Sequence, residues 1–181
     1  MSEASRVVPT IPRQAFSSID ADGFRNGMRL VPGAVSIIAT SFGGQKRGLT
    51  ATAVSSLAAE PPSLLVCVNQ NASAFEYFNL AGHFSVNQIP TRRLDLAKVF
   101  SSSLPADRAR RFREDEWTEL VTGAPILRDA VVSFDCELVE SKKFGTHGIF
   151  IGRIVSLHIN EQAEPLIYLN GKFSEAMPLA S

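Results

Sequence analysis

The stretch VSFDCELVESKKFGTHGIFIGRIVSLHI, residues 132–159, has the clearest period of two in the chain. Successive side chains of a β-strand point to opposite faces, so alternating apolar and polar residues predict half-buried strands at 132–140 and 147–159. The residues assigned to the apolar faces are Val132, Phe134, Cys136 and Leu138 in the first strand and Ile149, Ile151, Val155, Leu157 and Ile159 in the second.

The other face of the second strand carries Gly148, Phe150, Gly152 and Ile154. Two glycines four residues apart leave bare backbone that another surface can approach closely. We expect this face to be exposed and to form an isologous contact between two copies of the chain.

The segments on either side predict further strands and a few short helices. Ser73 and Glu76 have the spacing of a capping box, and Gly82 ends that helix. No repeated βαβ alternation occurs, so the pattern predicts an antiparallel barrel with helices packed outside it. Strands are expected at 34–41, 49–54, 63–69, 83–89 and 165–170, and helices at 20–30, 73–82 and 91–100.

The bulk composition predicts one domain. The chain has 181 residues, 45% of them hydrophobic, with 18 basic and 18 acidic residues. This length allows a sizeable core, and the balanced charge argues against a nucleic-acid or membrane partner. The run DRARRFREDE at 107–116 carries both signs and is interpreted as a solvated surface rather than a ligand patch.

A cytoplasmic location is expected, because no stretch has the length and apolarity of a secretory signal or a membrane span. Residues 1–19 are aperiodic and are interpreted as a flexible arm before a domain of residues 20–181. Cys67 and Cys136 lie in apolar strands without a CxxC or Cys/His cluster. We therefore expect two reduced, buried thiols and no metal site.

The segment GLTATAVSSLAAEPPSLLVCVNQNAS, residues 48–73, concentrates small and hydroxyl side chains before an apolar strand. Such residues allow close approach, either of another strand or protomer or of a ligand that also bonds to the backbone. Neither GxGxxG nor a P-loop occurs, so a Rossmann or P-loop nucleotide site is not supported.

Taken in order, several segments resemble the short-chain flavin reductases, the reductase components of two-component flavin monooxygenases. The resemblance spans about residues 20–175. It implies a Greek-key split β-barrel, a homodimer, FMN or FAD as flavin, NADH or NADPH as reductant, and a separate flavin-dependent monooxygenase that receives reduced flavin. The segments are GLTATAVSSLAAEPPSLLVCVN (48–69), NAS (71–73), FSVNQI (84–89), GAPILRDAVVSFDCEL (123–138), GTHGIFIGRIV (145–155) and PLIYLNGKF (165–173).

The resemblance implies that the flavin ring lies along the segment that begins at Gly48, with its phosphate at Ser73 and the N-terminus of the following helix. Many members of the family carry Arg or Lys at the position of Gln70, so Lys46, Arg47 or Arg92 would have to compensate the phosphate charge here. The flavin-binding residues so implied are Arg47, Gly48, Leu49, Thr50, Ala51, Thr52, Ala53, Ser55, Ser56, Cys67, Val68, Asn69, Ala72 and Ser73.

The resemblance also implies that His147 contacts or orients the nicotinamide; the alternative is a strand-edge histidine bonded to backbone. Phe173 would cover the flavin or stack on nicotinamide, or is a plain core residue. The residues implied on the nicotinamide side are Arg25, Asn26, Gly171, Lys172 and Phe173.

Two other function classes stay open at this point. One is a flavin-carrying binding or electron-transfer protein without turnover. The other is an oxidase like the pyridoxamine-phosphate oxidases, which would be revealed by formation of pyridoxal phosphate.

Overall fold

The computed structural model describes residues 16–177, which form antiparallel strands with a few short helices. This confirms the predicted mainly β class. The strands are β1 (Gly33–Ala34), β2 (Ser36–Phe42), β3 (Gln45–Ala51), β4 (Val54–Ala59), β5 (Pro62–Asn69), β6 (His83–Gln88), β7 (Trp117–Glu119), β8 (Pro125–Leu127), β9 (Val132–Phe144), β10 (His147–Ile159), β11 (Leu166–Leu169) and β12 (Lys172–Glu175). The helices are α1 (Ala21–Met28), α2 (Phe75–Ala81), η1 (Thr91–Arg93), α3 (Leu94–Ser101) and α4 (Pro105–Arg108).

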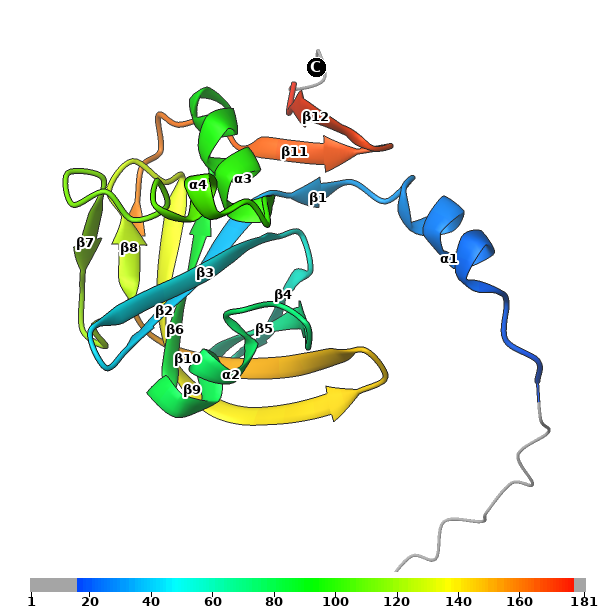
Figure 1. Cartoon of the computed structure of the whole chain (residues 1–181), viewed down its shortest axis with the longest axis horizontal. Helices are drawn as coiled ribbons and strands as arrows, with labels where there is room; N and C mark the ends of the chain where they lie inside the picture. The colour runs from blue at the N-terminus through cyan, green and yellow to red at the C-terminus, as the bar shows by residue number, and fades with distance from the viewer. Residues whose placement is uncertain (1–15, 178–181) are drawn as a thin grey trace, which may run out of the picture.

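Seven strands form the main sheet, in the order β3-β2-β6-β9-β10-β5-β4. A smaller sheet, β1-β11-β12, lies beside it, and β7 pairs with β8 (Figure 1). β3 and β4 are the two edges of the main sheet, although only Thr52 and Ala53 separate them in sequence. So short a linker keeps the end of β3 within roughly 11 Å of the start of β4. The sheet must therefore curl so that its two edge strands approach each other. No hydrogen-bonded ladder joins β3 to β4, and the strands do not close into a barrel.

The glycine face of β10 is buried, so the predicted exposed contact face is wrong. A Cβ added at Gly148 would lie 2.6 Å from Phe75 Cε2, and one added at Gly152 would lie 2.5 Å from Phe84 Cζ. Phe150 lies between them with its ring 5.3 Å from that of Phe75. The bare backbone therefore admits aromatic rings of the same chain, and the exposed apolar residues of β10 are on its C-terminal half: Val155, Leu157 and Ile159.

The polar face of β9 is buried in part, where the alternation predicted a solvent face: Ser133 and Asp135 are buried, whereas Glu137 is exposed. Ser133 Oγ donates to Asn87 Oδ1 at 2.8 Å. The Asp135 carboxylate accepts from the backbone N–H groups of Val121 and Thr122, at 2.7 and 2.9 Å. These bonds satisfy buried polar groups and fix the segment before β8 against the sheet.

Helix ends agree with the sequence in part. Asp20 caps α1 by accepting from Gly23 N at 2.7 Å, and Gly82 ends α2 with a φ of 69°. The predicted capping box at Ser73 is wrong, because Ala74 is the N-cap of α2 and makes no side-chain cap bond.

Helix α1 stands away from the sheets and buries none of its residues (Figure 1). The predicted flexible arm, residues 1–19, lies mostly outside the described residues; Phe16–Asp20 have no helix or strand and are exposed. No helix within residues 16–177 is long and apolar enough to cross a membrane.

Candidate functional site

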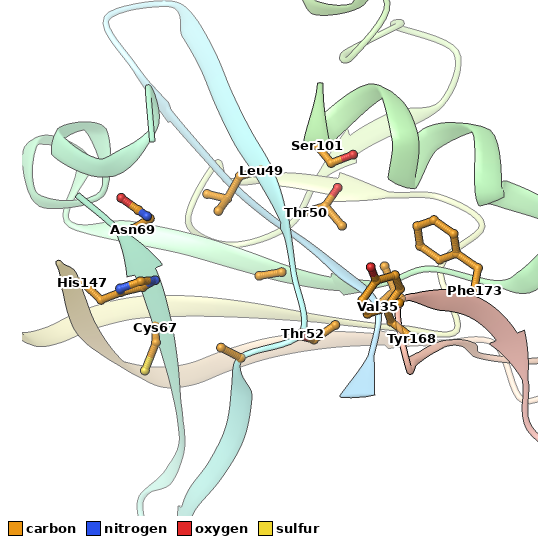
Figure 2. Close-up of a pocket in the computed structure, with 13 residues that line it drawn as sticks. Val35, Leu49, Thr50, Thr52, Cys67, Asn69, Ser101, His147, Tyr168 and Phe173 are labelled. Atoms are coloured by element: carbon orange, nitrogen blue, oxygen red, sulfur yellow. The ribbon is translucent and has the colours of Figure 1, made fainter. Parts of the chain in front are cut away.

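A cavity of about 510 Å³, the main cavity below, lies between the β3–β4 linker and the smaller sheet. Figure 2 shows His147, Asn69 and Cys67 at one end and Tyr168 and Phe173 at the other. Its volume is in the range of small-molecule sites. The lining residues are Val35, Leu49, Thr50, Ala51, Thr52, Ala53, Cys67, Asn69, Ser101, His147, Tyr168, Gly171 and Phe173.

One wall of the cavity is the edge of the main sheet. β3 pairs only with β2, so its other edge presents backbone N–H and C=O groups that no strand uses. Ala51 and Ala53 add little bulk, which lets a flat ligand approach that backbone. Thr50 Oγ1 donates to Ala97 O of α3 at 2.8 Å, so this hydroxyl holds the helix and can only accept from a ligand.

The absence of a side chain at Gly48 serves the packing of helix α3 rather than the approach of a ligand. A Cβ there would lie 2.9 Å from Phe100 Cε1 and 3.0 Å from Ile38 O. Close packing of α3 on β3 therefore requires the glycine, which is the packing explanation of small residues in this segment.

The second wall is the hairpin turn between β9 and β10. His147 is exposed and pairs with Asn69 in the strand register, while its Nδ1 lies 2.9 Å from Thr146 Oγ1. Gln70 Nε2 donates to Gly145 O at 2.8 Å and to His147 O at 3.1 Å. Gln70 thus ties the end of β5 to this turn and fixes the backbone that carries the imidazole.

The far end of the cavity belongs to the smaller sheet. The rings of Tyr168 and Phe173 meet edge to face, with centroids 5.2 Å apart. Gly171, at φ 77°, makes the β11–β12 turn, and the guanidinium of Arg29 lies beside it. Sequence reasoning chose Arg25, which instead forms an ion pair with Asp22 on α1.

Two further hollows, about 330 and 310 Å³, continue from the main cavity. Arg108 and Arg111 line both. Most of the run 107–116 is exposed, as expected, but Arg111 is buried. The alternating charges of that run gave no signal of this. Arg92, proposed as a phosphate partner, instead pairs with Asp129 at 3.4 Å and lines none of the three.

The structure brings together most of the sequence-predicted site residues. Those in the main cavity are Leu49, Thr50, Ala51, Thr52, Ala53, Cys67, Asn69, His147, Gly171 and Phe173. Those in the adjoining hollows are Arg47, Gly48, Ala72 and Ser73. Those outside all three are Arg25, Asn26, Ser55, Ser56, Val68 and Lys172. Residues that the sequence did not suggest include Val35, Ser101, Tyr168, Arg108 and Arg111.

The residues present fit a flat heterocycle that carries a phosphate. The ring would meet exposed edge backbone and aromatic side chains in the main cavity, and the anion would meet Ser73 and the arginines of the adjoining hollows. Helix α2 has only seven residues and no side-chain cap, so the arginines are the larger source of positive charge. Fold and cavity thus define a mainly β protein whose cavity lining fits a phosphorylated ring compound.

Comparison with known proteins gives the family. Residues 28–177 match the family model described as the flavin reductase like domain. The FMN reductase (NADH) RutF of Acinetobacter baylyi is 38% identical over 165 residues, which cover 91% of this chain and 87% of that protein. The chain belongs to the flavin reductase like domain family.

Solved structures show the same fold. A candidate flavin reductase from Haemophilus somnus is 37% identical, with a TM-score of 0.83 over 87% of this chain and all of that chain. BorF, the flavin reductase component of a bacterial two-component tryptophan halogenase, is 25% identical, with a TM-score of 0.78 over 86% of this chain and 98% of that one.

Proposed function

We propose that this chain is an NADH-dependent flavin reductase. The observation that carries the proposal is the main cavity, in which the backbone edge at Ala51–Ala53 lies between His147 and the aromatic pair of the smaller sheet. The name of the RutF relative supports FMN as the flavin and NADH as the reductant. FAD and NADPH stay as further options for this site.

A bound flavin would supply the hydride-accepting chemistry, so the protein's own contribution is orientation. The edge of β3 would bind the polar rim of the ring through backbone groups. His147 would contact the nicotinamide from the β9–β10 turn, and Phe173 would cover the open end against water. Holding two reactants in an attack geometry, with the reacting atoms roughly 3–3.5 Å apart, accelerates transfer without an acid or base from the protein.

We further propose that the reduced flavin leaves for a flavin-dependent monooxygenase or a related oxygenating partner. BorF, which has the same fold, is named as the reductase component of a two-component system. Several cavity residues are exposed, including His147, Ala53 and Gly171, which allows a flavin to enter and leave.

A homodimer is proposed through surfaces other than the buried glycine face. Phe24 and Met28 on α1 are 57% and 51% exposed, and Leu157 on β10 is 50% exposed. Helix α1 buries none of its apolar residues, and an apolar helix face of this kind is normally covered by another protein surface. A second copy of the chain would supply that surface. The division into an arm (1–19) and one domain (20–181), and the cytoplasmic location, remain predictions.

The experiment is NADH oxidation by the purified chain with and without added FMN. A flavin reductase oxidises NADH continuously only when flavin is present. A binding or electron-transfer protein would bind flavin without this turnover, and a pyridoxamine-phosphate oxidase would form pyridoxal phosphate instead. Either of the last two results would contradict the proposal.

A further inference from the structure

The backbone that carries His147 is held in a short, fixed turn. Phe144 pairs with His147 in the strand register, so only Gly145 and Thr146 connect β9 to β10. Gly145 has a φ of 54°, which glycine adopts easily at the first position of such a hairpin turn. Gln70 N donates to Thr146 O at 3.0 Å, beside the two bonds that the Gln70 side chain makes to the same turn. The backbone under the imidazole is therefore fixed before any substrate arrives.

The imidazole itself has little packing to restrain it. His147 is exposed, and its cross-strand neighbour Phe144 is 77% exposed. Figure 2 shows the ring of His147 extending toward the main cavity with a nitrogen at its tip. A side chain that is free to rotate loses this freedom when it contacts a substrate, which weakens the contact. A restraint on the ring before binding would therefore strengthen it.

One hydrogen bond supplies such a restraint. Thr146 Oγ1 lies 2.9 Å from His147 Nδ1, and among residues 16–177 no other side chain bonds to this imidazole. Because the two residues are neighbours in the chain, the bond limits the rotation of the ring without help from a distant element. It occupies Nδ1 and leaves Nε2 for a ligand.

The same bond can select the tautomer. A neutral imidazole carries one N–H, and the partner of one nitrogen decides which of the two nitrogens holds the proton. If the Thr146 hydroxyl donates to Nδ1, the proton lies on Nε2, and the free nitrogen of the ring becomes a donor. The carboxamide carbonyl and the phosphates of NADH are acceptors, so a donor at Nε2 matches them.

We propose that Thr146 is a positioning residue for His147. Its hydroxyl donates to Nδ1, orients the ring toward the main cavity and keeps the proton on Nε2, which donates to an oxygen of NADH. This inference rests on the proposed function and deepens it, because it names the group that prepares His147 for the hydride donor.

The test compares Thr146→Val, which removes the hydroxyl, with Thr146→Ser, which keeps it. Nitrogen-15 NMR of the imidazoles at about pH 8, where an ordinary histidine is neutral, reports the tautomer without flavin or NADH. The signals of His147 are assigned by their absence in His147→Ala. We expect a proton on Nε2 and none on Nδ1 in the wild type and in Thr146→Ser, and a mixture of both tautomers in Thr146→Val.

NADH oxidation with added FMN gives the second readout. Thr146→Val should raise the Michaelis constant for NADH about fivefold, in the range of one hydrogen bond, while kcat and flavin affinity change less than about twofold. Thr146→Ser should restore the wild-type value. A residue that served only the turn would instead alter the melting temperature, and serine would not rescue the Michaelis constant selectively.

Two results would overturn the proposal. One is a proton on Nδ1 of His147 in the wild type, or identical imidazole signals in the wild type and Thr146→Val. The other is an unchanged Michaelis constant for NADH in Thr146→Val. If the wild type does not oxidise NADH, the proposed function fails and the contact with NADH fails with it. The NMR result is distinct from that failure, because it decides the bond between Thr146 and His147 without turnover.

Discussion

At the scale of single residues, the packing of β10 on α2 and on a phenylalanine of β6 depends on two positions without a Cβ. Gly148 and Gly152 each face a phenylalanine ring at a distance that no side chain tolerates. These rings are buried and belong to one apolar core cluster of the described residues. A methyl group here has no space to enter unless a ring moves.

Gly152→Ala should therefore lower the free energy of unfolding by about 1–3 kcal/mol, the usual effect of overpacking a core. Urea denaturation measures the change. Gly27→Ala on α1 is the control, since nothing lies within 4 Å of its added Cβ and alanine favours a helix. Equal stability of Gly152→Ala and the wild type would refute the packing account.

The Cys136 thiol gives a pH dependence. Burial, and secondly the charge of Asp135, raise its pKa from 9.0 to about 12. The unfolded chain ionises this thiol first, so its contribution to stability is complete below about pH 9 and is lost as the pH rises toward 12. Denaturation between about pH 8 and about pH 10, below the main lysine titration, should show a decline in stability that is smaller in Cys136→Ala. The same decline in both proteins would exclude this thiol as its source.

At the scale of elements, the β9–β10 turn and the end of β5 act together to present His147. The only side-chain bonds between them that the described residues show run from Gln70 to the carbonyls of Gly145 and His147. Loss of these Gln70 hydrogen bonds would loosen the backbone that carries the His147 side chain without removing its imidazole.

His147→Ala should raise the Michaelis constant for NADH about tenfold while flavin affinity stays nearly unchanged, because only the nicotinamide contact is lost. Gln70→Ala should have a smaller effect in the same direction. The double variant should be no worse than His147→Ala, since Gln70 acts through His147. Additive effects in this cycle would argue against that coupling.

Elements were more predictable from sequence than the contacts among them. The end of α2 at Gly82 follows from a positive φ angle that glycine adopts easily. The start of α2 did not follow from its capping pattern, because the buried rings of Phe75 and Phe78 fix the helix on the sheet. Local spacing likewise could not reveal that Arg108 and Arg111 approach Gly48, some sixty residues earlier, since tertiary packing brings them there.

At the scale of the whole molecule, one helix stands apart from the sheets with its apolar residues in solvent (Figure 1). Exposed apolar residues on the C-terminal half of β10 add a second surface of the same kind. Surfaces like these are usual where two subunits meet.

Leu157→Glu and Met28→Glu should each shift the chain from dimer to monomer at micromolar concentration, because a charge would be buried at the contact. Sedimentation velocity measures the species, and Arg113→Glu, far from both surfaces in sequence and exposed, is the control. A wild-type monomer would contradict the proposed dimer.

The central claim is that the main cavity holds the flavin that NADH reduces. The most direct measurement is anaerobic rapid mixing of NADH with flavin and either wild type or Ala53→Leu, following the loss of the oxidised flavin's visible absorbance. Ala53 lies in the exposed linker and lines the cavity, so leucine should fill ring space while leaving the fold intact. The account predicts rapid reduction by the wild type and at least about tenfold slower reduction by a folded Ala53→Leu at subsaturating flavin. Equal rates in the two proteins would contradict it.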